Sequence, residues 1–230
     1  VRTNVEGTYN VLQAARDLGL SRVVHTSTSE IYGTAQYVPI DERHPANPQS
    51  PYAATKSGAD QLALSFHRSF GLPVTVVRPF NTYGPRQSAR AVIPAVAVQA
   101  LAGKKEIHLG NVNPTRDLTY VDDTVQGFLQ VGLHPETIGE VVNLGTGSEI
   151  SIGELARKIL SLAGSEATIV TDPQRFRPET SEVERLLSSP AKAKRLTGWA
   201  AQIALDEGLG RTVRWIRENL GRYRAEGYQI

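Results

Sequence analysis

The chain of 230 residues contains no cysteine and no methionine. Without cysteine it cannot form a disulfide bond, a thiolate metal site or a cysteine nucleophile. Its formal net charge of +2 is too small to indicate a nucleic acid or an acidic membrane surface as a partner. It has no apolar run near the roughly 20 residues of a membrane span, and no visible signal peptide. These absences lead us to expect a cytoplasmic protein that binds neither nucleic acid nor membrane.

The rest of the composition is that of a globular protein. Hydrophobic residues make up 40% and charged residues 21% of the chain, which is long enough for a sizeable core in one large or two small domains. The five histidines are scattered and form no cluster with the spacing of metal ligands, so we predict no metal site. We expect His44 and His108 to lie at the surface.

The first residues of the chain do not resemble a translation start, and they lead directly into a predicted helix. Residues 1–4 read Val-Arg-Thr-Asn, and the apolar stripe that follows predicts a helix already under way over residues 5–18. This helix leads into a short apolar strand around Val23 and Val24. A helix that feeds directly into a buried strand is the middle of an α/β unit. We therefore expect that the sequence lacks the N-terminal portion of its domain, through truncation or processing.

Strand and helix patterns then alternate. A helix is predicted from Pro51 to Phe70, because proline suits the first turn of a helix and Gly71 suits its end. A β-branched strand follows over residues 74–78. This alternation predicts a parallel sheet covered by helices, in which ligands bind beyond the carboxyl ends of the strands.

Beyond residue 84 the pattern changes to short strands mixed with helices, which predicts a smaller mixed lobe packed on the sheet. Ser151 and Glu154 have the spacing of a capping box, so a helix is expected to begin there. Residues 172–190 read as a long polar loop, and long loops are often functional.

Two polar motifs follow elements of the predicted sheet. Tyr52 and Lys56 are four residues apart in the predicted helix and therefore lie on one face of it. A lysine ammonium beside a phenol stabilises the phenolate, which makes Tyr52 a candidate general base at neutral pH. Glu30, in the hydroxyl-rich run directly after the first strand, is a second candidate base; the alternative for Glu30 is a surface carboxylate or a helix cap. Two bases indicate chemistry beyond a simple alcohol oxidation.

With these motifs in order, the chain resembles the extended short-chain dehydrogenase/reductase family, in its nucleotide-sugar epimerase/dehydratase branch. The matching stretches extend over most of the chain and are residues 4–8, 27–33, 52–56, 78–86, 116–123 and 143–147. The family's glycine-rich dinucleotide fingerprint is absent, and Gly145-Thr146-Gly147 is in the wrong place for it. The resemblance implies a Rossmann-like α/β sheet without its N-terminal portion. Residues 1–84 would be the C-terminal part of the dinucleotide-binding domain. Residues 85–230 would be mainly a substrate-binding lobe, with segments that return to the sheet.

Within this family the residues around Glu30 distinguish the reactions. Sugar 4-epimerases usually lack this glutamate, whereas 4,6-dehydratases carry an acid there to remove the C5 proton. The Thr-Ser-Glu of residues 28–30 is similar to GDP-mannose 4,6-dehydratases, although UDP-glucuronate decarboxylases also show it. Residues 32–42 and 84–94 look most like dehydratases of nucleotide-linked N-acetylglucosamine on the route to legionaminic acid.

The resemblance also implies roles for individual residues. Catalysis is expected at Thr28, Ser29, Glu30, Tyr52 and Lys56. The nicotinamide end of NAD, or of NADP, is expected at Ser27, Tyr52, Lys56, Pro79 and Phe80. The nucleotide-sugar substrate is expected at Asn81, Arg86, Arg116 and Arg177, where the guanidinium groups of Arg116 and Arg177 suit a diphosphate. Arg86 has the alternative of a structural partner for its own loop.

The sequence therefore predicts an NAD-dependent nucleotide-sugar 4,6-dehydratase that forms a homodimer through the helix of Tyr52 and Lys56. The nearest alternatives are a 4-epimerase and a uronate decarboxylase. An alternative of another class is a catalytically silent dinucleotide- or RNA-binding scaffold, or an inactive fragment. The identity of the nucleotide and of the sugar stays open at this point.

Overall fold

The structure, a computed structural model, describes residues 1–176 and 178–223. Its central feature is a three-stranded parallel sheet in the order β1-β2-β7. The strands are β1 (Val23–Thr26), β2 (Val74–Pro79) and β7 (Val141–Leu144). Val77 in the middle strand pairs with Thr26 on one side and with Val142 on the other. The middle strand is buried at its first five positions, which explains why it reads as an unbroken β-branched run instead of an alternating pattern.

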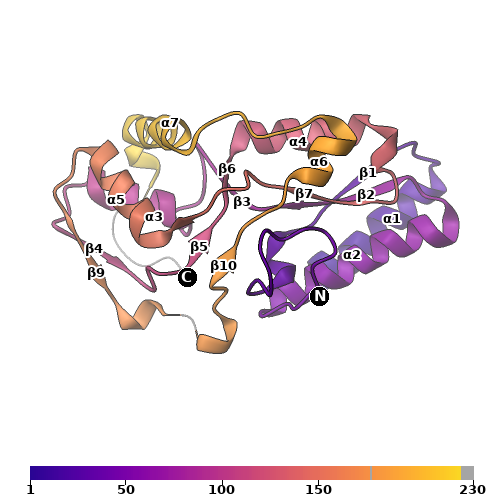
Figure 1. Cartoon of the computed structure of the whole chain (residues 1–230), viewed down its shortest axis with the longest axis horizontal. Helices are drawn as coiled ribbons and strands as arrows, with labels where there is room; N and C mark the ends of the chain where they lie inside the picture. Colours follow the sequence, from indigo (N-terminus) through magenta and orange to yellow (C-terminus); the bar gives the residue numbers. More distant parts are fainter. Residues whose placement is uncertain (177, 224–230) are drawn as a thin grey trace.

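Helices cover both faces of this sheet (Figure 1). One face carries α1 (Gly7–Asp17) and α2 (Pro51–Phe70), and the other carries α4 (Val121–Leu133) and α6 (Ala191–Thr197). Side chains of β2 alternate between the faces: Val76 packs with α1 and α2, and Val77 packs with α4 and α6. This arrangement is the α/β sheet that the sequence predicts.

Helix α2 has the ends that the sequence predicts. The hydroxyl oxygen of Ser50 accepts a hydrogen bond from the Ala53 N–H at 3.1 Å, so Ser50 is the N-cap and Pro51 takes the first helical position. At the other end Gly71 adopts the left-handed conformation, with φ +66°. The start of α2 lies close to the carboxyl end of β1, because the Lys56 ammonium reaches the carbonyl oxygen of Thr26.

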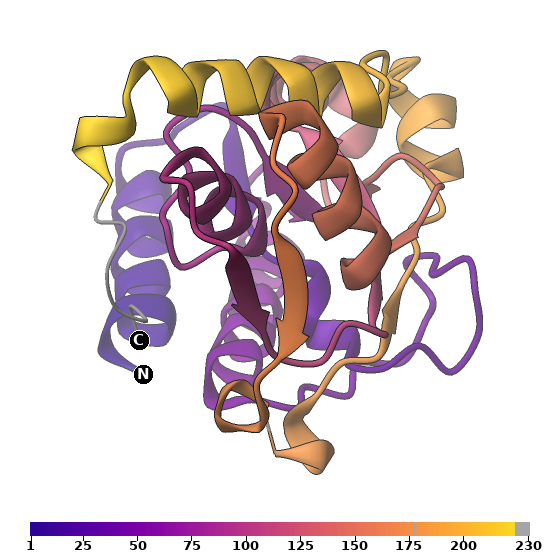
Figure 2. The same ribbon diagram turned by 90° about the vertical axis from the view of Figure 1, so that its left-hand side faces the viewer.

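The remaining elements form a second lobe, in which α7 crosses over α3 and α5 and the β4–β9 pair lies beside them (Figure 2). The helices are α3 (Val92–Leu101), α5 (Ile152–Ala163) and α7 (Leu205–Glu218). The strands are β4 (Glu106–Leu109), β5 (Thr115–Arg116), β8 (Ile150–Ser151), β9 (Thr168–Thr171) and β10 (Arg185–Leu186). Helices α3, α5 and α7 share one apolar core with β4, β8 and β9, whereas Leu186 of β10 packs with Ile31 and Phe80. Helix α5 begins with the predicted capping box of Ser151 and Glu154.

Two features connect the lobes. The first is the parallel pair of β3 (Asn81–Tyr83) and β6 (Leu118–Tyr120). The second is residues 184–189: β10 pairs with β5, and the Leu187 carbonyl oxygen accepts a hydrogen bond from the Ile40 N–H at 2.7 Å. The prediction of a long polar loop over residues 172–190 is therefore wrong at Arg185–Leu186, which form β10, and Leu186 is buried.

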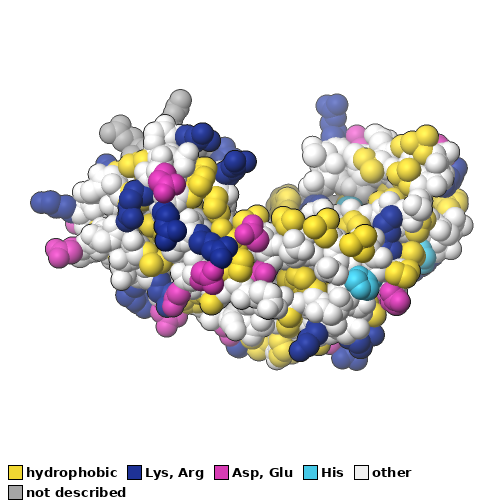
Figure 3. Space-filling view, turned by 90° about the horizontal axis from the view of Figure 1, so that it is seen from above, with side chains coloured by type: hydrophobic (Ala, Val, Ile, Leu, Met, Phe, Trp, Pro, Cys, Tyr) yellow, Lys and Arg dark blue, Asp and Glu magenta, His cyan; other side chains and the backbone are white. Residues whose placement is uncertain are grey.

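A groove separates the two lobes in the space-filling view (Figure 3). In the same view, Lys and Arg side chains gather on the lobe of α5 and α7. Several of them are paired, such as Lys158 with Asp206 at 2.7 Å. None of the helices in the described part of the chain is both long and apolar enough to cross a membrane. The domain boundary at residue 84 stays a prediction.

Candidate active site

The first part of the candidate site is the turn that follows β1. The hydroxyl of Ser27 is buried and donates to Asp60 Oδ2 at 2.8 Å. Thr28 is the N-cap of a short 3-10 turn, η2 (Ser29–Tyr32), and its hydroxyl oxygen accepts the Glu30 N–H at 3.3 Å. Ser29 is only 2% exposed, whereas Glu30 is half-buried and lines a large cavity. The turn thus presents one carboxylate, that of Glu30, to the cavity.

The second part is the start of α2, which packs against η2. Tyr52 is 52% exposed there. One turn further along the helix, the Lys56 ammonium donates to the Thr26 carbonyl oxygen. Burial lowers the pKa of Lys56, and the nearby charge of Asp60 opposes this shift. The Lys56 ammonium therefore lies at the carboxyl end of β1, and the start of α2, which carries Tyr52, packs against the turn of Glu30.

The third part is the segment after β2. Pro79 ends that strand, and Phe80 is buried against Ile31 and Tyr32, so it supports the Glu30 turn from behind. Asn81 opens β3 and lines the cavity. Its Oδ1 atom is buried and has no hydrogen-bond partner in the described part of the chain. A buried acceptor without a partner beside a cavity suits a ligand that donates a hydrogen bond.

The cavity measures about 1020 Å³, which is the size of a site for a nucleotide-linked ligand. Glu30 and Asn81 lie on its wall, and most of the remaining wall comes from α3, from β4 and from the segments that follow them. Arg116 and Glu182 also line it. The cavity thus lies between the Glu30 turn and the second lobe.

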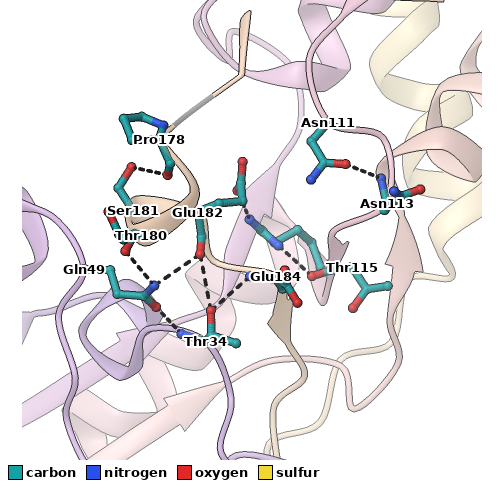
Figure 4. Close-up of polar contacts among 11 residues, drawn as sticks. Thr34, Gln49, Asn111, Asn113, Thr115, Pro178, Thr180, Ser181, Glu182 and Glu184 are labelled. Atoms are coloured by element: carbon teal, nitrogen blue, oxygen red, sulfur yellow. Dashed lines mark hydrogen bonds and ion pairs between the residues drawn. The ribbon is translucent and has the colours of Figure 1, made fainter. Parts of the chain in front are cut away.

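Arg116 is buried, and Thr115 and Glu182 are among its partners. Its guanidinium donates to the Thr115 carbonyl oxygen at 2.9 Å and lies 3.6 Å from the Glu182 carboxylate. Glu182 belongs to residues 178–184, which we call the strap. The strap lies against Thr34 and Gln49 of the loop between η2 and α2 (Figure 4). The sequence predicted Arg116 in the substrate site but not Glu182, which only the course of the strap brings to the cavity.

Two predicted substrate residues are not placed in this cavity. Arg86 is exposed, has the left-handed φ of +68° and lines a separate hollow together with Trp215 and Tyr223. Arg177 lies outside the described residues. The roles of all the predicted site residues stay predictions.

A buried network that the sequence analysis missed lies beneath the catalytic turn. Asp60 is completely buried, and its Oδ2 atom accepts from Arg78 Nε at 3.1 Å as well as from Ser27. Arg78 also donates to the Tyr32 hydroxyl at 2.9 Å, and that hydroxyl donates to Asn143 at 2.8 Å. Two signals were present in the sequence: Arg78 is a charge inside an apolar strand, and Asp60 continues the helix face of Tyr52 and Lys56.

Two other polar residues are buried, His44 against expectation and Asp117 without any prediction from the sequence. His44 is 3% exposed, so its prediction as a surface residue is wrong; its Nε2 atom accepts the Gln36 N–H at 2.9 Å. Asp117 is a fully buried carboxylate. Its carboxylate accepts from the Thr146 N–H and the Gly147 N–H, each at 2.9 Å. Burial raises the pKa of Asp117, and these hydrogen bonds oppose the rise.

This geometry can be compared with known proteins. The family model described as GDP-mannose 4,6 dehydratase matches residues 1–212. The chain belongs to this family. A UDP-glucose 4-epimerase of Mycolicibacterium smegmatis is 35% identical over 218 residues, which cover 93% of this chain and 68% of that protein. A dTDP-glucose 4,6-dehydratase of Streptomyces niveus is 36% identical over 220 residues, which cover 95% of this chain and 64% of that protein. The chain thus spans about two thirds of the length of these relatives.

Solved structures give the same result. The chain matches a dTDP-glucose 4,6-dehydratase of Streptomyces venezuelae, solved with NAD, with a TM-score of 0.87 and 35% identity over 96% of this chain and 68% of that one. It also matches a UDP-glucuronic acid 4-epimerase of Bacillus cereus, solved with UDP-glucuronic acid and NAD, with a TM-score of 0.88 and 28% identity over 95% and 68% of the two chains. These matches confirm the predicted α/β fold and the predicted enzyme family. The NAD in the solved relatives confirms the predicted cofactor of that family.

Proposed function

We propose that the protein is an NAD-dependent nucleotide-sugar 4,6-dehydratase, and that its substrate is an NDP-linked N-acetylglucosamine. The observation that supports a dehydratase reaction is the position of Glu30. Its carboxylate follows β1 directly and lines the cavity together with Asn81 and Arg116. An epimerase needs only oxidation and reduction at C4, whereas a dehydratase also needs a base for the C5 proton. The choice of sugar rests on the resemblance of residues 32–42 and 84–94 to dehydratases of that substrate.

Each proton-transfer step of this reaction can be assigned to a residue of this chain. Tyr52, as a phenolate stabilised by the Lys56 ammonium and assisted by the Thr28 hydroxyl, takes the proton of the C4 hydroxyl. Bound NAD would supply the acceptor for hydride from C4 and, once reduced, the donor of hydride to C6. The C4 ketone makes the C5 proton acidic; Glu30 removes this proton, and the C6 hydroxyl leaves as water with a proton from the same carboxyl group. Hydride at C6 is balanced by a proton returned to C5, which replaces the one that Tyr52 took from the C4 hydroxyl. The product is a 4-keto-6-deoxy sugar, formed with loss of one water and no net oxidation.

The residues near β1 fit the nicotinamide end of NAD. Tyr52 is half-exposed and offers its hydroxyl, and Lys56 offers an ammonium at the carboxyl end of the strand. A hydroxyl and an ammonium suit the hydroxyl groups of a ribose. Ser27, Pro79 and Phe80 would then shape the site from behind, because Ser27 and Phe80 are buried.

Arg116 is proposed to bind the diphosphate of the substrate. Its guanidinium lines the cavity, and guanidinium forks match phosphate oxygens. The roles of Arg86 and Arg177 as further substrate contacts stay predictions. A homodimer through α2 is likewise proposed, and light scattering of the full-length protein would test it.

A 4-epimerase is the second candidate, favoured by the 35% identity to the epimerase of Mycolicibacterium smegmatis. The deciding experiment incubates the full-length protein with NAD and, in separate reactions, with UDP-N-acetylglucosamine, GDP-N-acetylglucosamine or UDP-glucuronate, and follows the mass of the sugar nucleotide. Loss of one water supports the dehydratase. An isomer of unchanged mass identifies an epimerase, loss of carbon dioxide from UDP-glucuronate a decarboxylase, and NAD binding without turnover of any of these substrates a silent scaffold.

A further inference from the structure

The side chain of Gln49 joins three parts of the candidate site (Figure 4). Its Oε1 atom accepts the Thr34 N–H at 2.5 Å. Its Nε2 atom donates to the carbonyl oxygens of Thr180 and Glu182, at 3.1 Å and 3.2 Å. One carboxamide therefore uses its acceptor toward the segment after the Glu30 turn and its donors toward the strap.

The strap carries a residue of the cavity wall on its other side. The carboxylate of Glu182 lies 3.6 Å from Arg116, and the Glu184 carbonyl oxygen accepts the Thr115 N–H at 2.9 Å. Toward the catalytic lobe, the strap is held by Gln49 and by Thr34, whose hydroxyl donates to the Glu182 carbonyl oxygen at 3.3 Å and accepts the Glu184 N–H at 3.2 Å. The strap thus connects the Arg116 side of the cavity with the loop that leads to α2.

The backbone of Gln49 leads directly to the catalytic helix. Ser50, the next residue, is the N-cap of α2, and Tyr52 follows in the first turn. The carboxamide also packs on Gly33, three residues after Glu30. A Cβ atom at Gly33 would lie 2.6 Å from Gln49 Oε1 and 2.2 Å from the Asn47 carbonyl oxygen, and the fixed backbone at Asn47 leaves no room for a side chain. Both candidate bases are therefore linked to the strap through Gln49, and the segment after the Glu30 turn is linked to it through the Thr34 hydroxyl as well.

We propose that Gln49 is a positioning residue, which fixes the distance between the diphosphate end of the substrate site and the bases Tyr52 and Glu30. This inference rests on the proposed function. Gln49 does not itself line the cavity, so it acts through the strap and the start of α2. A sugar nucleotide that spans both ends depends on this distance, whereas a nucleoside diphosphate occupies only one end and depends on it much less.

The test compares Gln49→Ala and Gln49→Glu with Gln36→Ala in the full-length protein with NAD. Gln36 is exposed in the same loop, and its side chain makes no hydrogen bond to the described residues, so it is a matched control. For each variant we would measure kcat and KM for the sugar nucleotide, the Kd of UDP and GDP by calorimetry, and the thermal unfolding curve. The product mass of the unchanged protein separately decides the proposed function.

Gln49→Ala is expected to lower kcat on the order of tenfold, with the Kd of the nucleoside diphosphate changed less than about twofold. Gln49→Glu keeps the acceptor for Thr34 but turns a carboxylate toward two carbonyl oxygens, so it should be at least as impaired. Unchanged kcat in Gln49→Ala, unchanged kcat in Gln49→Glu, or an equal loss of diphosphate affinity and turnover would overturn the proposal. If the unchanged protein forms an isomer instead of the keto sugar, the proposed function fails while these ratios still decide the role of Gln49.

Discussion

The two halves of the candidate site are held in place by different kinds of interaction. The catalytic half rests on an ion pair: Asp60 and Arg78 are buried, and Asp60 also accepts from Ser27 at the start of the Glu30 turn. The substrate half rests on hydrogen bonds to backbone carbonyl oxygens and on a longer contact of 3.6 Å between Arg116 and Glu182. The same types of charged residue are therefore used in two ways.

The difference follows from what each half has to do. A buried ion pair is costly to disturb, because a lone charge is left in a medium of low polarity. Such a pair suits groups whose geometry must exist before the substrate arrives. A guanidinium that contacts a carboxylate on a cavity wall can instead exchange it for the phosphate oxygens of a ligand. The four predictions below test this contrast.

The largest effect is expected at the junction of the two halves, in Glu30→Gln. This change removes the proposed base for C5 but leaves Tyr52 and Lys56 in place, so sugar-dependent NADH formation should persist while release of water falls about 10²–10⁴-fold. Absorbance of NADH and the product mass measure the two steps. Glu136→Gln, at an exposed position, is the control. An equal loss of both steps would contradict the assigned role.

The next effect is expected in the catalytic half, in Asp60→Asn. In this variant the buried Arg78 guanidinium would lose the Asp60 carboxylate that pairs with it. Because an unpaired charge in the core is costly, the free energy of unfolding should fall by about 3–5 kcal/mol. Denaturant titration measures the change. Asp17→Asn is the matched control because this carboxylate is exposed at the end of α1, and a change within about 0.5 kcal/mol is expected there. Equal effects at the two positions would show that the ion pair does not support this half.

A smaller effect is expected where the Glu30 turn meets Gln49, in Gly33→Ala. Gly33 has φ +63°, and a Cβ atom would lie 2.2 Å from the Asn47 carbonyl oxygen. Strain and overlap together should cost about 2–4 kcal/mol of unfolding free energy. Gly19→Ala is the matched control, since Gly19 has φ +61° but nothing within 4 Å, and should cost only about 1–2 kcal/mol. If both variants lose the same free energy, the close packing at Gly33 is not a constraint.

The smallest effect is a shift in pH dependence. Burial lowers the pKa of Lys56, and Asp60 raises it. Because the ammonium is the active form, kcat/KM should fall as the pH rises through the pKa of Lys56, below the ordinary lysine value of about 10.4. Removal of the charge in Asp60→Asn should lower this pKa further and move the alkaline limb to lower pH. Steady-state rates across pH measure the shift; a limb that stays in place or moves to higher pH would refute the coupling.

Much of the fold is predictable from the sequence, because local interactions dictate it. Ser50, Pro51 and Gly71 mark the ends of α2, and Ser151 with Glu154 marks the start of α5; each signal acts within a few residues. The spacing of Tyr52 and Lys56 likewise places both on one helix face wherever the helix lies. The polar turn after β1 could be assigned to a ligand site because parallel strands end at one edge of a sheet.

The tertiary structure alone decided which distant residues meet. Asp60 finds Arg78 and Ser27 only because α2 packs on β1 and β2, and Glu182 reaches the cavity only because the strap crosses from one lobe to the other. Arg86 has a suitable charge but lies outside the cavity, and His44 has a polar side chain but is buried. The sequence by itself determined the elements and the chemistry available on each. Packing of their faces determined which of those groups share a site, since that choice depends on contacts between residues far apart in the chain.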